Sequence, residues 1–219
     1  MQLYIGNKNY SSWSLRAWLM LAKSGISFEE TQLELDTEHF YQALKQVTPT
    51  LKVPTLVDGD VTVWDSLAIC EYINETYLNG SGWPQEPAQR AKARALACEM
   101  HSGFMALRNE MPMNIRAKRM VELSSTAKKD IARIDDIFSQ CMQATQSTDK
   151  GSWLFGQWSI TDMMFAPVVM RLITYAIEMS APSQAYMKHV LACPDLNRWI
   201  DAALQETQIV AIDEAGVEI

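Results

Sequence analysis

The first 78 residues switch repeatedly between the hydrophobic spacing of strands and that of helices. Leu3–Ile5 is a short apolar run, and the segment from Asn9 to about Gly25 places apolar residues at helical intervals. Phe28–Leu35 alternates apolar and polar residues, which is typical of a strand. Because a helix-length crossover separates the two strands, we expect them to be parallel.

The following segments extend this pattern to β-α-β-α-β-β-α. Thr37–Gln46 predicts a short helix. Leu51–Val63 contains two β-branched runs around Asp58-Gly59-Asp60, and Asp-Gly supplies the positive φ angles that a tight hairpin needs. Asp65-Ser66 then begins a helix that we expect to end near residue 78.

Beyond the turn-rich stretch Asn79–Pro84 the pattern becomes entirely helical. Ser159–Asp162 is an S-x-x-D capping box, and the helix that it opens contains Pro167. The other predicted helices are Pro87–Leu107, Thr126–Ala144, Ala185–Leu191 and Leu196–Gln205. The pattern therefore predicts an α/β domain over residues 1–79 and an all-α domain over residues 86–219.

The composition is that of an ordinary globular protein: 219 residues, 48% hydrophobic and 21% charged. The net charge of −7 argues against a nucleic-acid partner, because there is no excess of cations to displace phosphate counterions. No apolar run is long enough to cross a bilayer, and the N-terminus lacks a basic region followed by an apolar one. We expect a cytoplasmic protein with no membrane partner.

The residues that most often bind metals are isolated along the chain. The cysteines and histidines are Cys70, Cys98, Cys141, Cys193, His39, His101 and His189, with no metal-ligand spacing among them. No G-x-S-x-G motif is present either. The sequence therefore favours neither a metal site nor a serine hydrolase.

Three serines, Ser11, Ser12 and Ser14, stand at the start of the first predicted helix. One hydroxyl is enough to cap a helix. A helix N-terminus also stabilises anions through its dipole and its free N–H groups. Capping is the simpler interpretation, and a site that stabilises a negative group is the functional one.

Two later positions also have a structural and a functional interpretation. Pro54 is either an ordinary trans proline at a strand edge, or a cis proline that leaves the Val53 backbone free to pair with an extended peptide. Asp65 and Ser66 either cap their helix or hold the charged head group of an amino acid.

Taken in order, four short motifs resemble those of the cytosolic glutathione S-transferase family, serine type, over essentially the whole chain. They are the serine turn ending in Arg16, Lys52-Val53-Pro54-Thr55, Trp64–Ile69 and Ser159–Asp162. The resemblance implies a thioredoxin-like N-terminal domain and a C-terminal helical bundle. It also implies glutathione as co-substrate, no metal, and a homodimer.

The resemblance places the activating hydroxyl at Ser12, with Ser11 as the neighbouring candidate. A hydrogen bond donated to a thiolate lowers the thiol pKa, and the thiolate is the nucleophile. Ser159 and Asp162 match the family's folding-related capping box and are not expected to be catalytic.

The same resemblance assigns glutathione-binding roles. Lys52 would meet the glycyl carboxylate, Val53 would pair with the cysteinyl unit, and Pro54 would be cis. Asp65 and Ser66 would hold the γ-glutamyl head.

The implied function is transfer of glutathione to small electrophiles, in detoxification or small-molecule metabolism, with peroxidase activity as a variant. Candidates for the electrophile pocket are Met100, Phe104, Met105, Arg108, Met111, Met113 and Tyr175, although much of this stripe has the spacing of plain core. Arg116 is a further cation able to attract an anionic electrophile.

Two alternatives remain. One is a non-catalytic binding protein on the same fold. The other is an isomerase of the zeta class, whose members isomerise maleylacetoacetate. The turn resembles the Ser-Ser-Cys arrangement of that class, but Trp13 stands in place of the cysteine, which weakens the isomerase interpretation and any thiol-disulfide role.

Overall fold

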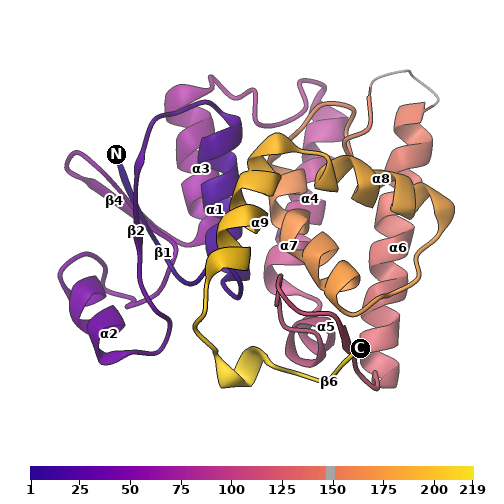
Figure 1. Ribbon diagram of the computed structural model, residues 1–219. Helices are drawn as coiled ribbons and strands as arrows, with labels where there is room; N and C mark the ends of the chain where they lie inside the picture. The colour runs from indigo at the N-terminus through magenta and orange to yellow at the C-terminus, as the bar shows by residue number, and fades with distance from the viewer. Residues whose placement is uncertain (147–150) are drawn as a thin grey trace.

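The computed structural model describes residues 1–146 and 151–219 and contains a mixed four-stranded sheet beside a layer of helices (Figure 1). The strands lie in the order β2-β1-β3-β4. They are β1 (Gln2–Ile5), β2 (Glu29–Gln32), β3 (Thr55–Asp58) and β4 (Val61–Trp64). The first two are parallel, as the crossover predicts, and β3 runs antiparallel to both β1 and β4.

Helices cover both faces of this sheet, with α1 (Ser12–Lys23) and α3 (Ser66–Tyr77) on one face and α2 (Glu38–Lys45) on the other (Figure 1). Side chains of a strand point alternately to its two faces. In β1, Leu3 and Ile5 are fully buried in the main core, whereas Tyr4 packs against a separate cluster that includes Phe40 of α2. The expected α/β fold followed by a mainly helical region is confirmed, with one short strand pair, β5 (Arg119–Met120) and β6 (Val217–Glu218), in the second region.

The helical region surrounds α7 (Ile160–Thr174), in which every residue except Ile173 is buried. This helix packs against α1 and α4. Its neighbours in the chain are α4 (Pro87–Ser102), α5 (Met105–Glu110), α6 (Ser125–Gln146), α8 (Ala181–Leu191) and α9 (Pro194–Gln205). Pro167 lies inside α7, and the predicted capping box is formed at its start, where the Ser159 N–H donates to Asp162 at 2.8 Å.

The predicted helix Pro87–Leu107 is wrong as a single element, because the chain breaks after Ser102. Gly103 follows in an extended conformation, where a Cβ atom would lie 2.7 Å from the Glu99 carbonyl oxygen. Phe104 is left-handed, with φ 58°, and α5 starts after it. The apolar spacing runs on through the break, so the hydrophobic pattern conceals it.

The last part of the chain holds the elements that the pattern did not predict. Both α8 and α9 begin earlier than expected, each with a proline in its first turn, where the missing N–H costs nothing. A short 3₁₀ helix, η1 (Ala211–Asp213), follows α9. The chain then pairs as β6 (Val217–Glu218) with β5 (Arg119–Met120).

Among the helices of the described residues, none combines the length and apolar character needed to cross a bilayer.

Candidate active site

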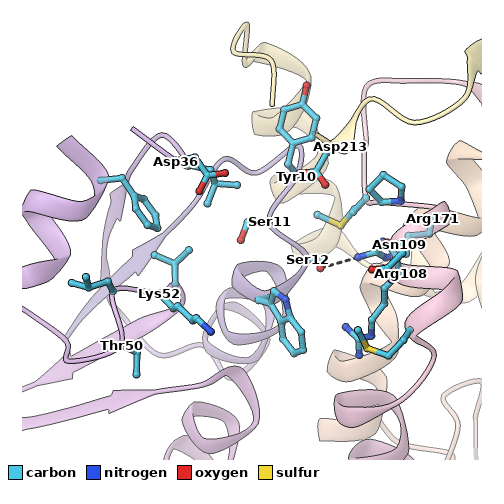
Figure 2. A pocket seen from close by; sticks show the side chains of 18 of the residues that line it. Tyr10, Ser11, Ser12, Asp36, Thr50, Lys52, Arg108, Asn109, Arg171 and Asp213 are labelled. Carbon is cyan, nitrogen blue, oxygen red and sulfur yellow. Dashed lines mark hydrogen bonds between the residues drawn. The ribbon is translucent and has the colours of Figure 1, made fainter. Parts of the chain in front are cut away.

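A cavity of about 750 Å³ lies where the loop between β1 and α1 meets the helical region. Figure 2 shows the side chains that surround it. A second cavity of about 510 Å³ extends toward Asp65 and Ser66 at the start of α3. Trp13, Lys52 and Val53 line both cavities, so the two form one groove.

The loop that carries the serines is fixed by residues far along the chain. Glu206, just after α9, accepts hydrogen bonds from the backbone N–H groups of Lys8 (2.6 Å) and Asn9 (2.9 Å). The Trp199 indole donates to the Lys8 carbonyl at 2.9 Å. The Asn9 side chain also bonds to Asn114 at 2.9 Å. These contacts hold the turn rigidly between the sheet and the helices.

The three serines of the turn have three different roles. Ser11 is the N-cap of α1, and its hydroxyl donates to the Ser14 oxygen at 2.7 Å. Ser14 is fully buried and accepts the Gly6 N–H at 3.1 Å. Ser12 takes no part in this capping network. Its oxygen accepts a hydrogen bond from Arg171 at 3.0 Å and lines the large cavity (Figure 2).

Because Arg171 donates to Ser12, the Ser12 proton remains available to an acceptor in the cavity. Arg171 comes from α7 and is only 6% exposed. Its other terminal nitrogen donates to the carbonyls of Met111 (2.5 Å) and Arg108 (3.3 Å). Burial, together with the neighbouring Arg108, lowers the Arg171 pKa to about 10, so the guanidinium is still charged at neutral pH. A buried cation therefore lies directly behind the serine hydroxyl.

Trp13 contacts two more guanidinium groups. The central carbons of Arg16 and Arg108 lie 4.4 and 4.8 Å from the centre of its ring, a cation–π geometry. Burial lowers the pKa of Arg16 well below its ordinary value, as do Arg108 and Arg171. Two nitrogens of Arg16, Nε and Nη1, are buried without a hydrogen-bond partner among the described residues. Positive charge is thus concentrated at one end of the groove.

The backbone beside this turn has an uncommon conformation. The Val53–Pro54 peptide bond is cis, as the resemblance implies. Thr55 donates its hydroxyl to the Lys52 carbonyl at 2.9 Å. Within the described residues, neither backbone group of Val53 forms a backbone hydrogen bond outside the strands, and Val53 precedes β3. The groove therefore offers one free peptide edge to an extended ligand.

At the far end of the groove, Asp65 caps α3 with φ 75°, and one of its oxygens accepts the N–H groups of Leu67 and Ala68 at 2.9 and 3.3 Å. The other oxygen lies 3.1 Å from His101 Nε2. Burial lowers the His101 pKa, so the imidazole is neutral at neutral pH and donates to Asp65. The Ser66 hydroxyl is buried and has no partner among the described residues, although it lines the groove.

The comparisons with known proteins agree with this geometry. The family model for the glutathione S-transferase N-terminal domain matches residues 10–76. This segment is therefore assigned to the N-terminal domain of the glutathione S-transferase family. The matched segment contains the serine turn, the cis proline and the start of α3.

Among curated proteins, a probable maleylacetoacetate isomerase from Caenorhabditis elegans is 36% identical over 110 residues, about half of each chain. A stringent starvation protein A homologue from Histophilus somni is 23% identical over 78% of this chain and 77% of its own. The solved structure of a glutathione transferase homologue from Burkholderia, with bound glutathione, is 24% identical. It covers 92% of this chain and 97% of its own with a TM-score of 0.71, which shows the shared fold.

In the structure, the predicted glutathione-binding residues lie together along the groove. They are Ser11, Ser12, Lys52, Val53, Pro54, Asp65 and Ser66. Their grouping follows from the fold, because the β1–α1 loop, the start of β3 and the start of α3 meet at one end of the sheet.

The predicted electrophile pocket is only partly formed by the expected residues. Met105, Arg108 and Met113 line the large cavity. Met100 and Tyr175 are instead buried in the core and do not line it, and neither does Phe104, whose left-handed backbone marks the break before α5.

Two other candidates also point elsewhere. Met111 is fully buried. Arg116 donates to Tyr10 Oη at 3.0 Å and to the Gln208 carbonyl at 2.7 Å, so it anchors the C-terminal segment.

Several lining residues were not predicted from the sequence, namely Tyr10, Asp36, His101, Asn109, Arg171 and Asp213. Arg171 had a detectable sign, because it is the one cation in α7 and interrupts an otherwise apolar run over residues 163–173. A charge in a helix that is buried on all sides must face a polar group or a cavity. Asp213 had no such sign in the sequence, because its position depends on how the chain folds back after α9.

Proposed function

We propose that this chain is an enzyme that binds glutathione, activates its thiol and joins glutathione through its sulfur to small electrophiles. The observation that carries this proposal is the Arg171–Ser12 hydrogen bond. It fixes the Ser12 oxygen as an acceptor and leaves the hydroxyl proton for a thiolate in the cavity. A free cysteine thiol has a pKa near 8.5, so it is mostly protonated at neutral pH and poorly nucleophilic without such help.

Three local features lower the thiol pKa in this proposal. Ser12 donates a hydrogen bond to the charged sulfur, the N-terminus of α1 contributes its dipole, and the buried Arg171 adds positive charge. One pKa unit corresponds to about 1.4 kcal/mol, and a hydrogen bond to a charged group contributes roughly 1.5–3 kcal/mol. Ser12 and its neighbours are therefore sufficient for a shift of one to two units.

The rest of the groove fits the tripeptide. We propose that Val53 pairs through its backbone with the cysteinyl unit and that Lys52 meets the glycyl carboxylate. Asp65 and Ser66 hold the γ-glutamyl head, and the unpartnered Ser66 hydroxyl supports this assignment, because a buried hydroxyl without a partner is costly unless a ligand completes it.

The cations around the large cavity favour an electrophile with an anionic group. Arg108 and Arg171 both line the cavity, and Arg108 lowers the pKa of Arg171, as two cations in a buried site do. A carboxylate on the second substrate relieves this repulsion. Isomerisation of a small unsaturated acid is an alternative reaction of an anionic substrate at the same site. Trp13 weakens this alternative, because zeta-class members have a cysteine at that position.

We further propose that residues 1–79 and 86–219 are two domains that share one groove, and that the protein is a cytoplasmic homodimer. Val61, Trp64 and Tyr77 are each more than two-fifths exposed on β4 and α3, and Trp64 also lines the groove. A dimer that covers this surface places each glutathione site near the interface. Light scattering on the purified protein tests it directly, and a monomer at micromolar concentration contradicts it.

The test of the function combines calorimetry with turnover. Glutathione should bind the wild-type protein, and conjugation, peroxide reduction and cis-trans isomerisation of an unsaturated dicarboxylate are measured on the same preparation. Ser12→Ala should lower conjugation strongly while glutathione still binds. If the folded wild-type protein binds no glutathione, the alternative of a non-catalytic binding protein is favoured. The similarity to a stringent starvation protein A homologue is the reason to consider this alternative.

A further inference from the structure

The segment after α9 folds back to the cavity and contributes one carboxyl group to its wall. Asp213, the last residue of η1, lines the same cavity as Ser12 and Arg171. In the view of Figure 2, Asp213 and Tyr10 lie above the two serines, Ser11 and Ser12. The other carboxyl group among the described residues that line this cavity is that of Asp36.

Residues on either side of Asp213 hold it in place. The neighbouring Glu214 accepts hydrogen bonds from Tyr10 Oη (2.5 Å) and Asn114 Nδ2 (2.9 Å) and pairs with Arg119. Upstream, Arg116 donates to the Gln208 carbonyl at 2.7 Å. The Asp213 carboxyl is therefore fixed with respect to the β1–α1 loop, although much of the segment is exposed.

The Asp213 carboxyl itself accepts no hydrogen bond from any residue that the structure describes. The charged and titratable groups that face it are Arg171 and Tyr175 from α7 and Asp36 from the segment after β2. Burial, opposed by Arg171 and assisted by Asp36, raises the Asp213 pKa to about 6. At neutral pH the group is thus mainly a carboxylate with free lone pairs, and it can take up a proton.

We propose that Asp213 is the general base that accepts the thiol proton of glutathione at this site, an inference that rests on the proposed function. In this step the S–H bond breaks, its electron pair stays on sulfur, and the proton moves to an Asp213 carboxylate oxygen, directly or through one water. The Ser12 hydroxyl then donates a hydrogen bond to the thiolate. Because Asp213 is only half-buried, it passes the proton on to solvent and returns to the carboxylate form.

Two other oxygen-bearing groups in the cavity are poorer bases. The Ser12 oxygen already accepts a hydrogen bond from the Arg171 cation, which disfavours taking up a further proton. Asp36 also lines the cavity, but its carboxylate accepts the Tyr41 hydroxyl at 3.0 Å. This difference makes Asp36→Asn a matched control, since it removes a carboxylate from the same cavity without removing the proposed base.

The experiment mixes the full-length protein with glutathione by stopped flow and records ultraviolet thiolate absorbance together with proton release to an indicator dye. Asp213→Asn should slow thiolate formation by about 100-fold, the lower end of the usual contribution of a general base. The final amount of thiolate should not fall, because the variant removes a negative charge near the sulfur. In the wild type, the rate should decrease as the pH falls through about 6, and Asp213→Asn should lack this dependence.

Asp36→Asn should keep the fast phase, with its pH dependence moved slightly lower, because Asp36 raises the Asp213 pKa. Equal rates in the wild type and Asp213→Asn overturn the assignment. So does a loss of glutathione binding in Asp213→Asn, measured by calorimetry, since that result makes Asp213 a positioning residue for the C-terminal segment. If the wild type itself forms no thiolate, the proposed function fails rather than the role of Asp213 alone.

Discussion

Arg171 in α7 donates a hydrogen bond from Nη2 to the hydroxyl oxygen of Ser12 at the start of α1, across 3.0 Å. The two residues lie far apart in the sequence: Arg171 belongs to the helical region and Ser12 to the thioredoxin-like region. The contact joins the N-terminal sheet region to the helical region at the large cavity. It also separates Ser12 from the capping serines, Ser11 and Ser14.

Arg171→Met should raise the thiol pKa of bound glutathione by about one unit and lower the conjugation rate about tenfold, because Ser12 loses a charge-assisted hydrogen bond. Arg171→Lys should give an intermediate result, since a single ammonium does not reproduce the geometry of two guanidinium nitrogens. Spectroscopic titration of the bound thiol measures both variants.

The matched control for this experiment is Arg133→Met, which removes an exposed arginine paired with Glu99 away from the groove. It should change neither the thiol pKa nor the rate. A thiol pKa that is the same in Arg171→Met and in the wild type argues that Arg171 serves only to hold the Met111 carbonyl.

Ser66→Ala should weaken glutathione binding by about tenfold, the loss expected for one hydrogen bond, while the thermal midpoint stays the same or rises. The two effects have opposite signs because the Ser66 hydroxyl is buried without a partner in the described protein. Calorimetry and thermal unfolding on the same variant measure them. A fall in stability of Ser66→Ala with unchanged glutathione affinity shows that Ser66 has a structural partner instead. The control variant is Ser102→Ala, which changes an exposed serine.

Asp162 makes the stability of the protein depend on pH in a particular direction. Burial raises its pKa to about 6, in spite of the hydrogen bonds from Leu154, Ser159 and Tyr186 that oppose the shift. Since the folded state then holds a proton that the unfolded state has lost, the contribution of this residue should fall by roughly 3 kcal/mol as the pH rises from about 4 to 6.

The measurement is denaturant unfolding of the wild type and of Asp162→Asn across this pH range. The free energy of unfolding of the wild type, taken relative to the variant, should decrease with rising pH. An increase instead shows that the donated hydrogen bonds outweigh burial at the start of α7.

The sequence predicts the sheet and its helices well because their signals are local. Alternation in Phe28–Leu35, the Asp58-Gly59-Asp60 turn and the S-x-x-D box each specify an element within a few residues. The break at Gly103 escapes the pattern, because apolar spacing continues to Leu107 while the conformation is set by close approach to the Glu99 carbonyl.

The candidate site is predictable to the extent that it lies on such local motifs. Ser12, Lys52 and Asp65 fall beside recognisable turns. Arg171 and Asp213 reach the cavity only through tertiary packing, the first inside α7 and the second through the anchoring of Glu214. Tyr175 was misplaced because its spacing at the end of α7 says nothing about which side of this helix faces the cavity.

The central claim is that Ser12, rather than Ser11, stabilises the glutathione thiolate. The most direct test is a pH titration of the thiolate absorbance in complexes of glutathione with the wild type, Ser12→Ala and Ser11→Ala. The account predicts that Ser12→Ala raises the bound thiol pKa by about one to two units. It also predicts that Ser11→Ala costs about 1 kcal/mol of stability as a lost helix cap and leaves the thiol pKa in place. An unchanged thiol pKa in Ser12→Ala, or the shift appearing in Ser11→Ala instead, contradicts the account.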